Sequence, residues 1–209
     1  MATYERRMRG GYDIDDTKIS FMVPFLDFAS PILGRKLDYD SMHDFNIALS
    51  LGVSSEKAFE LLRDFYSSEN FSRLPAVDGA LDALQYTSLF SDIYDITARD
   101  SNLREKTRHA LNLGFVSKGI SITELIFCPH FYDGKKESKA DVAERLKLDY
   151  MVEDSPSHSI AISERGIPVF MLRRPWNAHV SSNSLLKVCD SWHQVVEGID
   201  KIRKNGSSA

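Results

Sequence analysis

The fold is decided by the stretch GYDIDDT, residues 11–17. In it Asp13 and Asp15 stand two positions apart, and Thr17 closes the segment. Two carboxylates with this spacing at the end of a strand point into one small volume, where each raises the pKa of the other unless a cation intervenes. Mg²⁺ suits such a place because it prefers hard oxygen ligands and keeps water and substrate phosphate in its shell. Taken alone, an acidic turn that ends in Thr is an equally good interpretation, because short motifs also arise by chance.

Three further polar groups follow later in the chain, each at an expected strand end or helix start. Thr97 ends an apolar segment, and its hydroxyl could hold a phosphate oxygen together with backbone N–H groups of a following helix. Lys139 begins a helical segment, where the helix dipole disfavours a cation, so it could neutralise Asp13 and a phosphate. Glu153 and Asp154 end a short apolar run, where paired acids suit a metal. The ordinary alternatives are a strand-ending Thr, a surface Lys and an Asp that caps the next helix.

Short apolar segments alternate with helical ones in the second half of the chain. We expect strands at residues 92–97, 123–128, 150–153 and 168–172. We expect helices at residues 101–113 with Ser101 as the cap, and at 138–146, 155–165 and 191–203. This alternation favours a parallel sheet with helices on both faces. In such folds the site lies at the carboxyl ends of the strands, where all four polar groups fall.

A different pattern covers residues 18–75. Aromatic residues recur there at helical spacing, namely Phe21, Phe25 and Phe28. A second helix is expected at residues 54–66, and no strand pattern is evident. We therefore predict a three-layer α/β fold with a Rossmann-like parallel sheet, and a small inserted helical cap. The sheet domain would comprise residues 1–17 and 76–209, and the cap residues 18–75. The aromatic residues would form the core of the cap, and some of them are candidates to face the base of a ligand.

Composition limits the class of protein. The chain has 209 residues, of which 43% are hydrophobic and 27% charged, as is ordinary for a globular protein. The net charge of -4 argues against stable nucleic-acid binding, which usually requires a basic surface. Two cysteines are too few for a disulfide framework, no apolar run approaches a membrane span, and residues 1–11 lack the apolar stretch of a secretory signal. We expect a cytoplasmic protein without membrane association that acts on a small molecule, with a homodimer as a candidate assembly.

The order of the four polar groups is more informative than any one of them. The sequence resembles the haloacid dehalogenase (HAD) superfamily, whose signature is D-x-D-x-T, then Ser or Thr, then Lys, then a closing acidic motif. Within it the chain resembles the 5'(3')-deoxyribonucleotidases and their bacterial relatives, from about residue 12 to residue 200. The segments FSRLPAVDG at 71–79 and RRPWN at 173–177 point to that family.

The resemblance implies a HAD-like fold and a phosphatase of the 5'-nucleotidase type. Asp13 would attack phosphorus and form an aspartyl-phosphate, while Asp15 would act as general acid and then as general base. Thr97 and Lys139 would bind the transferring phosphoryl oxygens. The implied Mg²⁺ ligands are Asp13, the backbone carbonyl of Asp15, Asp154 and, as a secondary ligand, Glu153. The substrate would be a small phosphomonoester, a nucleoside monophosphate with preference for deoxyribonucleosides. Two alternatives stay open: a phosphatase for another metabolite such as a sugar phosphate, and a non-catalytic binding protein.

Three positions depart from the pattern of these nucleotidases. Asp16 stands where they usually have Gly, and Glu153 where Asp is commoner. The strand expected before Asp13 is polar, since residues 6–12 hold three Arg and two Gly, which suit a central strand poorly. Either tertiary contacts override this propensity or the nucleophile is badly held.

The segment at 173–177 also holds residues that could pack against the core or contact the substrate. Trp176 is expected to pack a loop against the core, and Arg173 or Arg174 could touch substrate. His158 follows the second acidic pair and is a weaker candidate for contact with the site.

Overall fold

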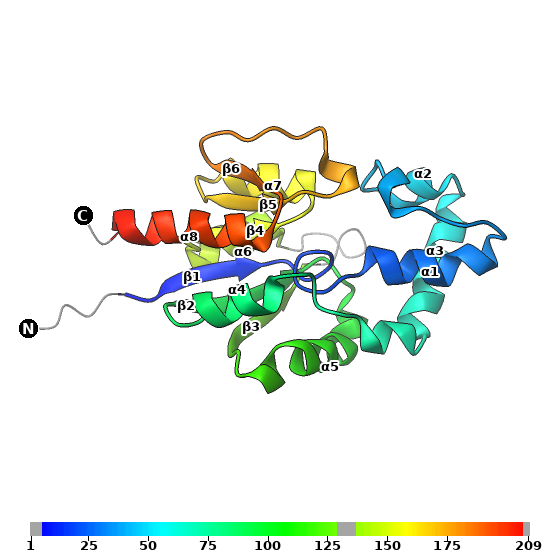
Figure 1. The fold of residues 1–209 in the computed structure, drawn as a ribbon, viewed down its shortest axis with the longest axis horizontal. Coiled ribbons are helices and arrows are strands. Elements are labelled where there is room, and N and C mark those ends of the chain that lie inside the picture. Colours follow the sequence, from blue (N-terminus) through cyan, green and yellow to red (C-terminus); the bar gives the residue numbers. More distant parts are fainter. Residues whose placement is uncertain (1–5, 129–136, 207–209) are drawn as a thin grey trace, which may run out of the picture.

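A six-stranded sheet forms the centre of the molecule in the computed structural model, which describes residues 6–128 and 137–206 (Figure 1). Every neighbouring pair of strands is parallel, and the strand order is β3-β2-β1-β4-β5-β6. The strands are β1 (Met8–Tyr12), β2 (Ser91–Thr97), β3 (Ile122–Phe127), β4 (Tyr150–Glu153), β5 (Val169–Leu172) and β6 (Leu186–Cys189). The predicted α/β class and parallel sheet are therefore confirmed.

Helices cover both faces of this sheet and complete three layers. One face packs against α4 (Ala80–Thr87), α5 (Arg104–Gly114) and α8 (Trp192–Gly206). The other packs against α6 (Lys139–Leu146) and α7 (Pro156–Ser163). No helix within the described residues combines the length and the apolar character that a membrane crossing requires.

The four predicted strands and the four predicted helices of this region are present, with ends shifted by a few residues. Ser101 was expected to cap α5, but it does not. It opens a short 3₁₀ turn, Ser101–Leu103, which Asp100 caps through a side-chain bond from the Asn102 N–H. Strand β6 was not predicted, because its four residues, LKVC, lack a clear apolar run.

The polar segment before Asp13 does form a strand, and β1 lies at the centre of the sheet between β2 and β4. Close packing requires a glycine at position 10 and leaves little room at Gly11. A Cβ on Gly10 would overlap the ring of Tyr150, and one on Gly11 would overlap side chains of β4 and the loop before it. The arginines serve the other end of the strand, where Arg7 donates to Asp92 and to three backbone carbonyls. Tertiary contacts thus override the weak strand propensity.

A helical insertion, residues 18–75, leaves the sheet just after β1 and returns before α4. It contains α1 (Met22–Ile32), α2 (Ile47–Leu51) and α3 (Ser55–Ser67), with short 3₁₀ turns at Tyr39–Ser41 and Asn70–Arg73. These helices extend beyond the carboxyl ends of the strands, on the right in Figure 1. They enclose an apolar core of their own, in which Phe21, Phe25 and Phe65 are buried. The division into a sheet domain and a cap domain at residues 18 and 75 stays a prediction.

Candidate active site

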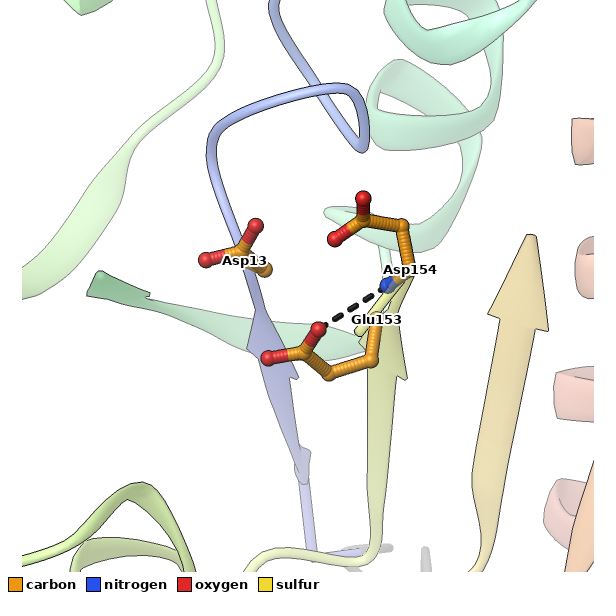
Figure 2. A group of neighbouring side chains, drawn as sticks. All are labelled: Asp13, Glu153 and Asp154. Atoms are coloured by element: carbon orange, nitrogen blue, oxygen red, sulfur yellow. Dashed lines mark hydrogen bonds between the residues drawn. The ribbon is translucent and has the colours of Figure 1, made fainter. Parts of the chain in front are cut away.

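Three carboxylates converge where β1 and β4 end side by side. Asp13 follows β1, and its backbone N–H donates to the Val152 carbonyl of β4, 2.9 Å away. Glu153 ends β4 and Asp154 follows it. Figure 2 shows the three side chains turned toward one shared space. Each offers an oxygen within 4.8 Å of the other two, and all three residues are buried. Residues 140 positions apart in the chain therefore form one acidic cluster.

Lys139 joins the cluster from the first turn of α6. Its Nζ donates to Asp13 Oδ1 and, over 2.5 Å, to Glu153 Oε1. Ser138 and Asp141 form a capping box that starts the helix at this point. Only 2% of Lys139 is exposed, so the interpretation of this residue as a surface Lys is wrong. Burial lowers the pKa of its ammonium, but Asp13 and Glu153 outweigh that effect and hold the pKa above its usual range.

The two acids at the end of β4, Glu153 and Asp154, differ in the groups that their carboxylate oxygens bind. Glu153 Oε1 accepts from Lys139, and its Oε2 accepts from the backbone N–H groups of Asp154 and Ser155, both at 2.9 Å. Asp154 Oδ2 accepts from the indole N–H of Trp176 at 3.0 Å. Asp154 does not cap the helix after it, because Ser155 occupies the N-cap position of α7. Of the pair, Asp154 therefore has the freer carboxylate and Glu153 anchors Lys139.

The cluster carries more negative than positive charge. Three carboxylates face the ammonium of Lys139, and His158 also acts on Glu153, so negative charge exceeds positive charge when all these groups are ionised. Burial raises the pKa of Asp13 to about 7, although Lys139 opposes the shift. Burial, reinforced by the charge of Asp13, raises the pKa of Asp154 well above its usual range. A divalent cation would remove this surplus, and hard oxygen donors are the ligands that Mg²⁺ prefers. The donor set therefore fits a metal, with Asp13 and Asp154 as the better-placed ligands.

Asp15 lies apart from these three acids and pairs with Arg99. Two hydrogen bonds join them, from Arg99 Nε to Asp15 Oδ2 at 2.8 Å and from Nη2 to Oδ1 at 2.5 Å. The guanidinium also donates to Thr107 Oγ1 and lies 4.8 Å from the centre of the Phe71 ring. Its side chain is 1% exposed. Sequence reasoning missed Arg99, although an Arg two positions beyond Thr97, at the same strand end as the acid pair, was a usable signal.

Thr97 lies at the end of β2, the neighbour of β1, where it was expected. Its buried hydroxyl accepts a hydrogen bond from the Arg99 N–H at 3.1 Å. The next two residues, Ala98 and Arg99, line the cavity above the acids. The sequence and the structure thus agree on the place of Thr97, and its phosphate-binding role stays a prediction.

Asp16 serves the start of the helical insertion. It has a positive φ of 50°, the conformation for which Gly is the usual residue. Its carboxylate accepts from the backbone N–H groups of Phe21 and Met22 at 3.0–3.1 Å, where α1 begins. Burial raises the pKa of this carboxyl to about 7. Asp16 thus holds the start of α1 from a backbone conformation that glycine adopts more easily.

A cavity of about 180 Å³ lies between the acidic cluster and the insertion. Its floor is charged, with Asp13, Asp15, Lys139 and Asp154 among the lining residues. The side chains that the insertion contributes are largely apolar, namely Phe21, Met22, Phe45, Ile47 and Tyr66. Of the three phenylalanines considered as contacts for a base, only Phe21 lines it, and His158 does so from the sheet domain.

Arg173 and Arg174 do not line this cavity. Arg173 pairs with Asp190, and Arg174 donates to the Asp16 carbonyl through Nε at 2.9 Å and Nη2 at 2.5 Å. The idea that either one touches substrate finds no support in this arrangement. Pro129 and His130, which were expected to form a loop after β3, lie outside the described residues.

Comparison with known proteins gives the same picture. No family model matches the chain. A Bacillus cereus protein named "Putative nucleotidase" is 26% identical over 178 residues, which cover 83% of this chain and 90% of that protein. A HAD family hydrolase from Deinococcus radiodurans, solved with bound phosphate and sodium, superimposes with a TM-score of 0.61 at 14% identity, covering 95% of this chain and 97% of the other. A predicted phosphoglycolate phosphatase from Haemophilus somnus gives a TM-score of 0.65 at 12% identity, over 94% and 100% of the two chains.

The structural neighbours establish the fold, and the sequence match extends along most of the chain. The similarity to these proteins agrees with the order of the four sequence motifs. Three of these motifs supply the residues of the acidic cluster, namely Asp13, Lys139 and the pair Glu153 and Asp154. On these grounds the chain has a HAD-like fold, and its sequence is similar to those of proteins named as putative nucleotidases.

Proposed function

We propose that the chain is a Mg²⁺-dependent phosphatase of nucleoside monophosphates, with preference for deoxyribonucleotides. One observation carries the proposal: Asp13, Lys139 and Asp154 come from three distant segments and meet at the floor of a cavity whose far wall is aromatic and apolar. The floor suits a phosphate, and the wall suits a flat, weakly polar group such as a nucleobase.

Asp13 is the proposed nucleophile. One of its carboxylate oxygens would attack phosphorus, the bond from phosphorus to the ester oxygen would break, and an aspartyl-phosphate would form. Asp15 would give a proton to the departing oxygen. In the second step Asp15 would take a proton from a water molecule that attacks phosphorus, and the bond from Asp13 to phosphorus would break. The sum is hydrolysis of a phosphomonoester to an alcohol and inorganic phosphate.

Lys139 and Thr97 are the proposed phosphate ligands. Lys139 already bonds to Asp13, so a phosphoryl group on that carboxylate would lie beside its ammonium. Thr97 ends the neighbouring strand, next to cavity-lining Ala98. Fixed charges and donors at such places contribute about 3–4 kcal/mol each to the stability of a transition state.

The proposed metal ligands are Asp13, Asp154 and the Asp15 backbone carbonyl, which accepts no hydrogen bond from the described part of the chain. Glu153 has a secondary role, since its oxygens hold Lys139 and two backbone N–H groups. When bound, Mg²⁺ would supply positive charge against the phosphate and against the surplus charge of the acids. Arg99 holds the Asp15 carboxylate at the cavity wall through two hydrogen bonds, one of which would open when Asp15 carries the proton that it gives to the leaving group.

The helical insertion is proposed to act as a cap that selects the substrate. Aromatic rings from it line the cavity, and a nucleobase can stack on such rings. A sugar phosphate would instead need polar partners for several hydroxyls, which the apolar residues of this wall do not provide. Burying three acids beside one Lys costs desolvation free energy. A purely non-catalytic role gives no reason for the fold to bear that cost.

The test is phosphate release from a panel of nucleoside 5'- and 3'-monophosphates and sugar phosphates, with Mg²⁺ and with EDTA. We expect nucleotides to be preferred and EDTA to abolish turnover. Asp13→Asn should lower kcat by about 10⁴-fold or more, whereas Asp27→Asn, on the exposed face of α1, is the matched control and should leave it unchanged. Parent-like turnover by Asp13→Asn would refute the mechanism, and indifference to the base would favour another phosphorylated metabolite.

A further inference from the structure

The segment after β5 holds Asp154 at two points. The indole N–H of Trp176 donates to Asp154 Oδ2 at 3.0 Å. The amide of Asn177 donates to the Asp154 carbonyl at 2.8 Å and to the Leu172 carbonyl at 2.7 Å. Trp176 is 2% exposed and Asn177 fully buried. Both the carboxylate and the backbone of Asp154 are therefore positioned by this segment.

The ring of Trp176 belongs to a different part of the molecule. Among the described residues, Trp176 is the one member of the apolar core of the helical insertion that lies outside residues 18–75, and Phe21 and Met42 belong to the same core. Tyr39 of the insertion meets it edge to face, with ring centres 5.8 Å apart and planes at 76°. One side chain thus joins the core of the insertion by its ring and the acidic cluster by its N–H group.

The same segment also touches the entrance to the insertion. Arg174 donates twice to the carbonyl of Asp16, and the Asp16 carboxylate in turn accepts from the N–H groups at the start of α1. Arg174 and Trp176 therefore connect the insertion with the sheet domain at two places, and one of them ends on a carboxylate of the acidic cluster.

We propose that Trp176 couples the seating of the helical insertion to metal binding. Its ring, fixed by Tyr39 and the apolar core, sets the position of the N–H group that orients Asp154 as a ligand. Trp176 also lines the cavity, but toward the metal it is a positioning residue, because it acts through the Asp154 carboxylate. The inference rests on the proposed function only in taking Asp154 as a metal ligand. Because coupling between two sites is reciprocal, metal binding would also favour the seated insertion.

The test uses Trp176→Phe, which keeps an aromatic ring in the core and removes the donor. The dissociation constant of Mn²⁺ is measured by electron paramagnetic resonance, without substrate. We expect Mn²⁺ to bind about 10-fold more weakly, the lower end of the effect that outer partners of metal ligands have. Trp192→Phe is the matched control, because Trp192 is equally buried and its indole donates to the Thr17 carbonyl at 3.0 Å. It should bind Mn²⁺ within twofold of the parent.

The coupling itself is tested at Tyr39. Tyr39→Ala removes the ring that seats Trp176 but leaves the indole donor, and it should weaken Mn²⁺ binding severalfold, whereas Tyr39→Phe should not. In turnover, Trp176→Phe should raise the Mg²⁺ concentration for half-maximal activity by the same factor as the Mn²⁺ constant. Parent-like Mn²⁺ affinity in Trp176→Phe would overturn the role of Trp176, and parent-like affinity in Tyr39→Ala would overturn the coupling. Failure of the parent to bind Mn²⁺ would refute the metal site of the proposed function instead.

Discussion

Two buried lysines bond to acids on or next to the strands of the sheet, and they differ in the balance of charge around them. Lys18 bonds to one carboxylate only, that of Asp95: its Nζ donates to the two oxygens at 2.7 and 2.8 Å. Both side chains are fully buried. Lys139 reaches two carboxylates and lies beside a third. The first arrangement is neutral, whereas the second keeps surplus negative charge.

The pKa directions follow the same difference. Burial lowers the pKa of Lys18 despite the favourable charge of Asp95. Several carboxylates hold the pKa of Lys139 above its usual range in spite of equal burial. A neutral buried pair has no need of a ligand, while an unbalanced cluster that faces a cavity can be completed by a cation and a phosphate. Charge balance therefore separates a structural ion pair from a reactive one in the same fold.

The largest expected effect comes from breaking the neutral pair. Lys18→Met leaves Asp95 buried without a partner, which typically lowers the free energy of unfolding by about 3–5 kcal/mol. Urea denaturation with and without Mg²⁺ measures it, and Mg²⁺ should not restore the loss. Replacing Asp95 by Leu in the same chain should recover most of the stability. A single variant as stable as the parent would mean that the pair is not the structural element described here.

The matched substitution in the unbalanced cluster should act on turnover. Lys139→Met is expected to lower kcat by about 10²–10³-fold, because one fixed positive charge toward the phosphate is lost. Its stability should recover in part when Mg²⁺ or Mn²⁺ is added, since a cation can offset the carboxylates. If Lys139→Met instead behaves like Lys18→Met, with lost stability that metal does not restore and unchanged kcat per folded molecule, the two lysines do not differ as proposed.

Metal and pH should act together on the unbalanced cluster. In the metal-free protein, burial raises the pKa of Asp13 from 3.8 to about 7, so the folded state keeps a proton that the unfolded chain releases. This group then contributes stability at low pH that is lost as the pH rises from about 4 to 7. A free Mg²⁺ concentration about 100 times its dissociation constant would add about 2.7 kcal/mol at pH 8, and less at pH 5.5, where protons compete for Asp13. Melting temperatures with Mg²⁺ and with EDTA at both pH values measure the difference; a larger gain at pH 5.5 would contradict it.

The smallest effect is expected at Asp16, which carries charge near the site without belonging to the cluster. Asp16→Gly removes the acceptor for two N–H groups of α1 but relieves the strain of a positive φ, so stability should change by less than about 1 kcal/mol. Asp16→Ala loses the same bonds and keeps the strain, and it should be less stable than the Gly variant by about 1 kcal/mol. Thermal unfolding of the two variants decides the order.

Most of the fold follows from local patterns in the sequence. Strands β2 to β5 are apolar runs between helical segments, which is the pattern of a parallel sheet buried on both faces. Strand β1 could not be predicted with this rule, because its reason lies on another strand: the ring of Tyr150 fills the space above Gly10. Helices α1 and α3 of the insertion follow from the helical spacing of aromatic and other apolar residues, whereas α2 and the turns were not predicted.

The site was predictable where residue type and chain order sufficed. Asp13, Lys139, Glu153 and Asp154 come together because the neighbouring parallel strands β1 and β4 end at the same edge of the sheet, where α6 begins. Two residues that bond to the acids of the site were missed, and both lie far from those acids in the sequence or in another segment. Arg99 meets an acid 84 positions earlier, and Trp176 was assigned to loop packing although its N–H group reaches Asp154. Such side-chain pairs depend on rotamers and on tertiary contacts, which the order of residues does not reveal.

The close packing between the central strands β1 and β4 has a consequence for mutational scans of this protein. Gly10 admits no larger side chain, since even a methyl group would overlap the buried ring of Tyr150 on β4. A growth-based survey of all substitutions would therefore score this position as intolerant as that of the Asp13 carboxylate. Only paired measurements of abundance and of turnover would separate them: the glycine variants would be scarce, whereas Asp13 variants would accumulate as intact and inactive protein.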